Sequence, residues 1–324
     1  MSMIRSSGVR VRVPASTANL GPGFDTLGMA LSLYSWVEMK PAASTVFHLY
    51  GDNLEGLPQD KSNLVYIVAQ SVFAEAGVDI PELEISMYSD IPLTRGLGSS
   101  ASAIVGALYA ANALIGSPLS ASKLLDMAVA LEHHPDNVGA SLYGGIITAV
   151  WDGVHADILR IEPPEQLEVL VAIPEFQLST SKAREVLPKQ VSLSDAVYNV
   201  GHTSILTAAL AMGRLDLISA AMRDRLHQPY RAPLVPGMMQ ILEEASQHGA
   251  LGTALSGAGP TLLALVDGQA GKREQLEGFL IEVLKSHDIS ARTLWLKPCT
   301  YGAQELTMDN DSSLLDYVRG EVKA

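Results

Sequence analysis

Hydrophobic and polar positions along the chain follow two periods, and these periods predict its elements. Residues 9–13 alternate valine with arginine, which is the period of a half-buried strand. Pro14 is expected to end that strand, and the small residues 15–28 to form a loop. Residues 64–76 place apolar side chains at helical spacing, and Gly77 stands where a helix C-cap glycine belongs. The same criteria predict strands at 30–39, 45–50, 83–88 and 146–151, and helices at 101–115 and 120–132.

The pattern restarts after a candidate linker at 161–166, which contains Pro163 and Pro164. Beyond it we expect strands at 168–173, 252–256, 261–266 and 291–297, and helices at 192–212, 215–226, 237–247 and 273–286. The residues from 307 onward are polar, with a short helix expected at 314–318. We therefore expect an α+β protein with domains at 1–164 and 165–306, followed by a C-terminal tail at 307–324.

Length, composition and charge narrow the class of protein. The chain has 324 residues, 48% hydrophobic and 18% charged, which is typical of a folded protein of about two domains. A net charge of −13 without a basic cluster argues against a nucleic-acid-binding surface. The one cysteine, Cys299, cannot form an internal disulfide, and residues 1–8 hold no apolar run of signal-peptide length. The longest apolar stretch, 101–115, is shorter than the roughly 20 residues that cross a bilayer. We expect a soluble, cytoplasmic protein with no membrane or nucleic-acid partner.

The most informative stretch, 92–101, reads PLTRGLGSSA. Gly96 and Gly98 allow the backbone to turn sharply and to bring its amides close to a ligand. An uncharged helix follows, and a helix N-terminus presents free N–H groups to a phosphate. The alternative is a plain turn in which Ser99 or Ser100 is the N-cap residue. The dinucleotide-binding motif does not apply, because no acidic residue stands about 20 positions further on to bind a ribose.

Three further segments agree with this loop in order and spacing. Residues 14–25 read PASTANLGPGFD, residues 134–138 read HPDNV, and residues 255–261 read LSGAGPT. Together the four segments resemble the motifs of the GHMP small-molecule kinases. The residues of 14–25 and 134–138 resemble the form that these motifs have in the homoserine kinases of that family. They span almost the whole chain, and four motifs in register are a specific signal.

This resemblance implies the GHMP kinase fold. That fold has an N-terminal α+β domain with a left-handed βαβ unit and a C-terminal ferredoxin-like α/β sandwich domain, with the site in the cleft between them. The resemblance also implies ATP as phosphoryl donor, Mg²⁺, and L-homoserine as acceptor, which gives O-phospho-L-homoserine in threonine biosynthesis, and it implies a homodimer. The nucleotide-binding residues that it implies are Ile91, Pro92, Leu93, Thr94, Arg95, Gly96, Leu97, Gly98, Ser99, Ser100 and Ala101, with Gly257 and Gly259.

The catalytic residues that the resemblance implies are Asn137, Ser100 and Glu132. Ser100 and Glu132 would be the Mg²⁺ ligands, since Mg²⁺ needs only one or two protein oxygens. Ser99 and Asp126 stay open as alternatives to them. Asn137 stands where mevalonate kinase-like members have an aspartate that acts as the base. An amide cannot accept a proton at neutral pH, so we expect no side-chain base to deprotonate the substrate hydroxyl.

Homoserine is a zwitterion with a hydroxyl group, so its pocket needs an anion for the ammonium and guanidinium groups for the carboxylate. The resemblance implies Asp25 for the first role and Arg184 and Arg231 for the second. The other substrate residues that it implies are Asn19, His134, Asn137 and Thr180. Two other functions stay open: a GHMP kinase for another small alcohol such as mevalonate, and a ligand sensor on the same scaffold without turnover.

Overall fold

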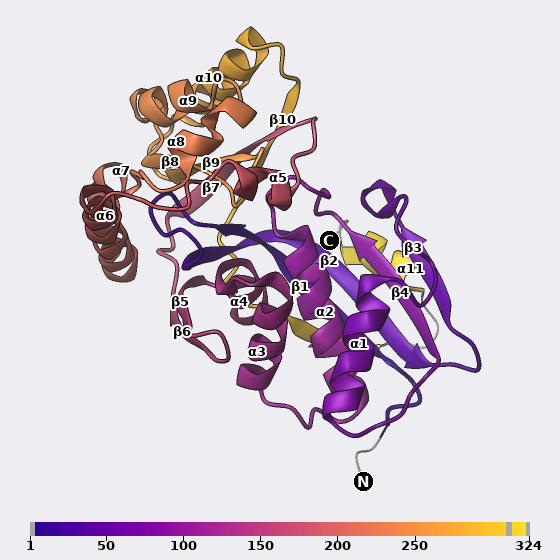
Figure 1. Cartoon of the computed structure of the whole chain (residues 1–324). Coiled ribbons are helices and arrows are strands. Elements are labelled where there is room, and N and C mark those ends of the chain that lie inside the picture. The colour runs from indigo at the N-terminus through magenta and orange to yellow at the C-terminus, as the bar shows by residue number, and fades with distance from the viewer. Residues whose placement is uncertain (1–3, 309–312, 322–324) are drawn as a thin grey trace.

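Two β-sheets organise the residues that the computed structural model describes, 4–308 and 313–321 (Figure 1). The seven-stranded sheet has the order β11-β1-β2-β4-β3, with β5 paired to β2 and β6 to β5. The four-stranded sheet has the order β10-β7-β9-β8. The first sheet contains β1 (Val9–Ala18), β2 (Leu27–Pro41), β3 (Val46–Tyr50), β4 (Leu83–Ser89), β5 (Ile146–Trp151), β6 (Ala156–Ile161) and β11 (Gln304–Leu306). The second contains β7 (Leu167–Pro174), β8 (Gly252–Leu255), β9 (Leu262–Asp267) and β10 (Ala291–Leu296).

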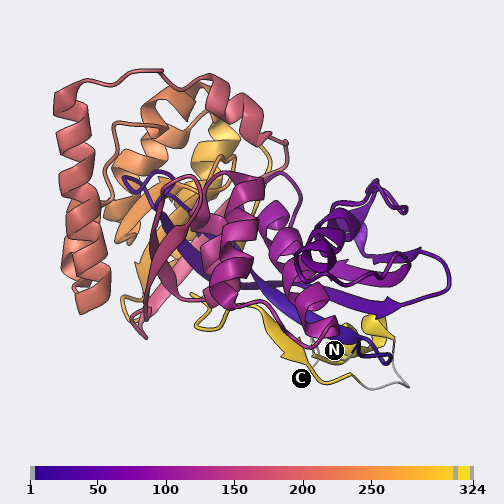
Figure 2. The same ribbon diagram turned by 60° about the horizontal axis from the view of Figure 1, so that its bottom comes forward.

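Helices cover one face of the seven-stranded sheet and form the N-terminal lobe with it (Figure 2). They are α1 (Leu64–Glu75), α2 (Ser99–Leu114), α3 (Ala121–Glu132) and α4 (Pro135–Tyr143). Strand β3 pairs with β4 in parallel, and α1 makes the crossover, as the implied βαβ unit requires. Alternation along β2 turns Val37 toward these helices and Trp36 toward the opposite face. There Leu314 and Val318 of α11 (Leu314–Glu321) pack against Trp36.

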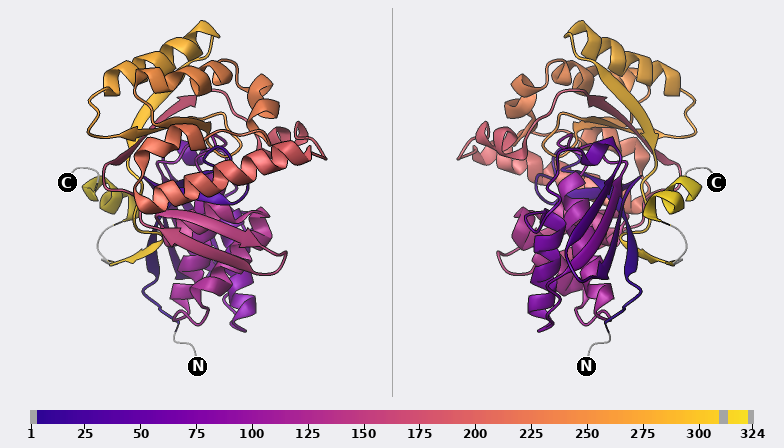
Figure 3. Two further views of the ribbon diagram at one scale, coloured as in Figure 1. Left: turned by 90° about the vertical axis from the view of Figure 1, so that its left-hand side faces the viewer. Right: turned by 90° about the vertical axis from the view of Figure 1, so that its right-hand side faces the viewer.

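The C-terminal lobe follows the order β7, helices, β8, β9, α10, β10, and neighbouring strands are antiparallel. This βαββαβ order is the ferredoxin-like arrangement. The lobe contains α5 (Thr180–Glu185), α6 (Leu193–Met212), α7 (Ile218–Ala221), α8 (Gln228–Arg231), α9 (Met238–Glu244) and α10 (Arg273–Ser286). Short 3₁₀ turns are η1 (Asp52–Leu54) in the first lobe, and η2 (Leu215–Leu217), η3 (Ala232–Leu234) and η4 (Ala245–His248) here. Figure 3 shows α6 as a long helix along one flank of the molecule.

The expected α+β fold class is confirmed, but several element predictions are wrong. Strand β1 does not stop at Pro14: the pairing register shifts between Pro14 and Ala15, and this bulge accommodates a residue without an N–H. The helix expected at 215–226 breaks after α7, where the Asp224 carboxylate accepts backbone amides that a helix would use otherwise. Five of the described helices and strands were not predicted: β6, α4, α5, α8 and β11.

The end of the chain returns to the first sheet. Strand β11 pairs with β1 across nearly the whole sequence, with Arg12 opposite Gln304. The expected second domain, 165–306, includes β11, but β11 pairs with a strand of the first sheet. The sequence did not indicate this pairing, because a three-residue edge strand has too short a pattern to be assigned. The tail expected at 307–324 includes α11, which packs on the first sheet, while 309–312 and 322–324 lie outside the described residues. The boundary at 164 lies between β6 and β7 and stays a prediction.

Candidate active site

A cavity of about 450 Å³ lies between the two lobes. The first lobe lines it with the loop 93–96, the start of α2, the α3–α4 corner and parts of β2, β4 and α1. The second lobe lines it with the start of α5, the end of α8 and the loop 257–259. One end of the cavity is charged, the other is apolar, and the glycine-rich loop lies between them.

The glycine-rich loop is held by both lobes. Gly98 has a φ of 70° and is the N-cap residue of α2, with no side chain bonded to the first helical amides. A Cβ at Gly98 would lie 2.2 Å from Ser16 Oγ, and one at Gly96 would lie 2.3 Å from the Ser256 carbonyl oxygen. Ser256 Oγ also donates to the Gly96 carbonyl at 2.6 Å. Only glycine fits at either position, and the free amides of α2 face the cavity as an anion site.

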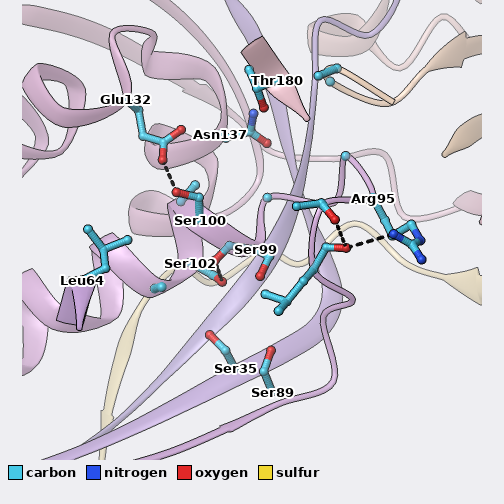
Figure 4. A pocket seen from close by; sticks show the side chains of 18 of the residues that line it. Ser35, Leu64, Ser89, Arg95, Ser99, Ser100, Ser102, Glu132, Asn137 and Thr180 are labelled. Carbon is cyan, nitrogen blue, oxygen red and sulfur yellow. Dashed lines mark hydrogen bonds between the residues drawn. The ribbon is translucent and has the colours of Figure 1, made fainter. Parts of the chain in front are cut away.

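Ser100 and Glu132 meet at this helix end. Ser100 Oγ donates to Glu132 Oε1 at 2.5 Å, and both residues line the cavity (Figure 4). Glu132 is the last residue of α3, and His133 ends that helix with a φ of 65°. The pair offers a hydroxyl and a carboxylate oxygen, the hard donors that Mg²⁺ prefers. These residues therefore fit a divalent cation that also binds phosphate oxygens.

The α3–α4 corner places three further polar groups. His134 is the N-cap residue of α4, and its Nδ1 lies 2.7 Å from Asp136 Oδ1. Burial of the imidazole opposes its protonation, but Asp136, and then Asp25 and Glu132, outweigh this effect and raise the pKa of His134. Asn137 Oδ1 accepts a hydrogen bond from Ser16 Oγ at 3.0 Å, which fixes the orientation of its amide.

At the charged end, Asp25 and Arg184 form a bidentate ion pair. The Asp25 oxygens accept from the two terminal nitrogens of Arg184 at 2.7 and 3.0 Å. The sequence predicted that one would bind an ammonium and the other a carboxylate. In the structure they neutralise each other, and their two charges are complementary to the two charges of a zwitterion. The Asn19 side chain shapes this loop: it donates to the Gly257 carbonyl and accepts from the Asp25 amide.

Arg231 faces the same end from α8 and is only 2% exposed. Its Nε donates to the Ala183 carbonyl at 3.0 Å, and its NH1 donates to the Gly257 carbonyl at 3.0 Å and to His227 Nδ1 at 3.2 Å. Burial and the charge of Arg184 lower the pKa of Arg231 to about 10. Because Nε and NH1 are committed to the protein, NH2 is the nitrogen left for an anion in the cavity.

The apolar end of the cavity was missed by the sequence reasoning. Ser35 lines it, and its Oγ is buried and has no hydrogen-bond partner among the described residues. Ser35 and Ser89 lie together at this end in Figure 4. A flat heteroaromatic ring with polar edges suits such a wall. Its apolar lining comprises Val37, Leu54, Leu57, Pro58, Leu64, Val65, Met87 and Tyr88.

Most residues implied by the resemblance line this cavity, and a few do not. Ile91 and Leu97 are fully buried in the core between the lobes, so their side chains do not face it. Pro92 lines a second cavity of about 580 Å³ behind the loop. Asp126 binds His155 and the Ala156 amide instead, so it is not a carboxylate of this site. Those that do line it are Asn19, Asp25, Leu93, Thr94, Arg95, Gly96, Gly98, Ser99, Ser100, Ala101, Glu132, His134, Asn137, Thr180, Arg184, Arg231, Gly257 and Gly259.

Comparison with known proteins identifies the family. The chain matches the model for the GHMP kinases N terminal domain over residues 63–145 and that for the GHMP kinases C terminal over 206–279. A homoserine kinase from Moorella thermoacetica is 42% identical over 293 residues, covering 90% of this chain and 98% of that protein. One from Deinococcus radiodurans is 45% identical over 284 residues, covering 88% and 92%. The crystal structure of homoserine kinase from Cytophaga hutchinsonii superposes with a TM-score of 0.83 at 28% identity, covering 94% of this chain and 99% of that one.

The chain therefore belongs to the GHMP kinase family, and within it to the homoserine kinases. Across the described residues, no helix combines the length and the apolar character that crossing a membrane requires.

Proposed function

We propose that the protein transfers the γ-phosphoryl group of ATP to the hydroxyl of L-homoserine. The observation that carries this proposal is the sharing of one cavity by the free amides of α2 and the charged cluster of Asp25, Arg184 and Arg231. The amides suit a polyphosphate, and the charged cluster suits an amino acid. The names of the relatives support the same substrate.

The two substrates would lie at opposite ends of the cavity. The nucleobase would occupy the apolar end, where Ser35 Oγ lacks a partner among the described residues. The triphosphate would follow the loop 93–96 to the start of α2. Homoserine would place its ammonium near Asp25 and its carboxylate near Arg231 and Arg184, with its hydroxyl directed at the γ-phosphate. His134, Asn137, Asn19 and Thr180 complete this end of the cavity.

We propose that Ser100 and Glu132 hold Mg²⁺. A bound Mg²⁺ would neutralise charge on the phosphate oxygens during transfer. The protein's own part is positioning: the α2 amides hold the phosphates, and the charged cluster holds the acceptor. No step requires Ser100 or Glu132 to exchange a proton.

We further propose that no side chain of the site acts as general base. Asn137 cannot accept a proton, and its Oδ1 is already bonded to Ser16 Oγ. The hydroxyl proton would leave for the γ-phosphate or for solvent, late in a loose transition state.

A homodimer is proposed as well. Helix α6 supports it, because its solvent-exposed apolar residues include Leu193, Val197, Val200 and Ile205, at 81%, 63%, 67% and 51% exposure. Light scattering of the purified protein, compared with Val200→Glu, tests this proposal: a monomer before substitution contradicts it. A cytoplasmic location also stays a proposal, supported by the lack of a second cysteine for an internal disulfide.

The decisive experiment measures ADP release with four candidate acceptors. L-Homoserine has the hydroxyl, the ammonium and the carboxylate. 4-Hydroxybutyrate lacks the ammonium, and 3-amino-1-propanol lacks the carboxylate. Mevalonate is the acceptor of the alternative kinase. We expect turnover with homoserine and a loss of about 30-fold in kcat/KM with each truncated compound, since each lacks a charge-assisted hydrogen bond worth roughly 2 kcal/mol. Faster turnover of mevalonate would favour the alternative kinase. Binding of ATP without ADP release from any acceptor would favour the ligand sensor.

A further inference from the structure

A buried histidine lies against the charged end of the cavity without lining it. His227 is 0% exposed and immediately precedes α8. Its ring stacks on Phe24 with centroids 5.1 Å apart. Its Nε2 lies 2.7 Å from the Gly21 carbonyl oxygen, and its Nδ1 lies 3.2 Å from NH1 of Arg231. The His227 ring therefore contacts both the loop that carries Asp25 and the side chain of Arg231.

The two neighbours fix the tautomer of His227. A carbonyl oxygen can only accept, so Nε2 carries the hydrogen and donates it to Gly21. A guanidinium can only donate, so Nδ1 must present its lone pair to Arg231. An imidazolium would set an N–H against the N–H of Arg231. The geometry therefore requires a neutral ring with its proton on Nε2.

Asp224 and Asn199 anchor this ring. The Asp224 carboxylate accepts from the backbone amides of Leu226, His227 and Gln228 at 2.6 to 3.0 Å. Asn199 Nδ2 donates to Asp224 Oδ1 at 2.8 Å and to the Pro22 carbonyl at 3.0 Å. The same hydrogen-bond network therefore connects the turn before α8 to the loop around Pro22. Burial lowers the pKa of His227, Asp224 opposes this, and Arg231 adds to it, which agrees with a neutral ring.

We infer that His227 is a positioning residue that sets homoserine affinity by holding Arg231 against the loop 19–25. Arg231 alone could rotate about its long side chain. The Nδ1 lone pair, with the Ala183 and Gly257 carbonyls, occupies Nε and NH1 and leaves NH2 directed to the cavity. His227 itself touches neither substrate in the proposed arrangement. This inference rests on the proposed function, since it concerns the carboxylate of the same amino acid.

Two substitutions separate the two nitrogens of the ring. In H227N, the amide oxygen takes the place of Nδ1 and can still accept from Arg231, while the bond to Gly21 is lost. In H227Q, the terminal amide nitrogen takes the place of Nε2 and still donates to Gly21, while Arg231 loses its acceptor. H248Q is the matched control, because His248 stacks on Phe279 within the C-terminal lobe and does not line the cavity.

Steady-state kinetics with homoserine and ATP give the readout, together with thermal unfolding of each variant. We expect H227Q to raise the homoserine KM about tenfold, since a hydrogen bond to a charged group is worth roughly 1.5 kcal/mol, and to leave kcat and the ATP KM within about twofold. H227N is expected to keep the homoserine KM within about threefold of wild type. A residue that only supports the fold would lower the melting temperature in both variants and would not separate their KM values.

Equal homoserine KM values in H227N and H227Q, or a change confined to kcat, would overturn the inference. If H227Q does not fold, D224N takes its place: it weakens the anchor of the ring and is expected to raise the homoserine KM at least about threefold. An unchanged KM in D224N also overturns the inference. The wild type is measured first. If it does not phosphorylate homoserine, the proposed function itself is wrong; if it does and the variants do not separate, only the role of His227 is wrong.

Discussion

Replacement of Arg231 by alanine tests the charged end of the cavity most directly. The guanidinium has five N–H donors, and the Nε and NH1 donors serve the Ala183 and Gly257 carbonyls and His227. A substrate carboxylate can therefore pair with NH2 only. A charge-assisted hydrogen bond of this kind is worth about 1.5–3 kcal/mol, below the roughly 2–5 kcal/mol expected of a fully committed buried pair. Arg231→Ala should then raise the homoserine KM about 10- to 150-fold.

The assay follows ADP release at saturating ATP over a range of homoserine concentrations. Because three acceptors lose a partner, each at a cost of about 1–3 kcal/mol when buried, the variant should also be less stable. Kinetics are therefore measured below its unfolding transition. The control is Arg214→Ala, which removes an exposed arginine paired with Asp216. A homoserine KM within about twofold of wild type would refute the assignment of Arg231 to the homoserine carboxylate. A large rise in the ATP KM would mean that Arg231 binds the nucleotide instead.

The remaining predictions concern Ser100, Asn137 and His134. Ser100→Ala should raise the KM for Mg·ATP about tenfold and leave homoserine binding unchanged, since it removes one oxygen of the proposed cation site; the reverse pattern would exclude Ser100 from that site. Asn137→Asp should bring no large gain in kcat, and a gain with a new pH dependence would mean that a base can assist the reaction. His134 has a raised pKa, so its protonation stabilises the fold. The stability advantage of wild type over His134→Asn should be full below about pH 6.5 and should decline as the pH rises through the raised pKa. Thermal unfolding at pH 5.5 and 8.5 measures this, and an advantage that grows with pH would contradict the reasoning.

The sequence predicted those parts of the site that a motif or a periodic pattern of neighbouring residues indicates. The glycine-rich loop stands out because Gly96 and Gly98 lie at positions where a Cβ would collide with Ser256 or Ser16. Helices such as α1 were found because their apolar residues repeat within a few positions of one another. The resemblance to the homoserine kinases, in 14–25 and 134–138 and at Arg184 and Arg231, then supplied the residues of the charged end.

Other parts could not be predicted, because they depend on residues far apart in the sequence. Val37 and Met87 read as ordinary strand residues, and only their pairing across β2 and β4 makes this wall of the apolar end of the cavity. The ion pair between Asp25 and Arg184 joins two lobes over 159 positions, so no local pattern indicates that they neutralise each other. His227 showed no motif, because its role comes from contacts with Gly21 and Arg231 rather than from its neighbours.

The return of the chain to its first sheet has a consequence for biosynthesis. Strand β11 and helix α11 leave the ribosome after the second lobe, yet they cover the edge at β1 and the outer side of Trp36 in the first lobe. The first lobe therefore cannot reach its final form during translation until the second has been made. A gene cut at codon 164 would yield a fragment with a bare strand edge and an uncovered tryptophan, a combination that promotes self-association.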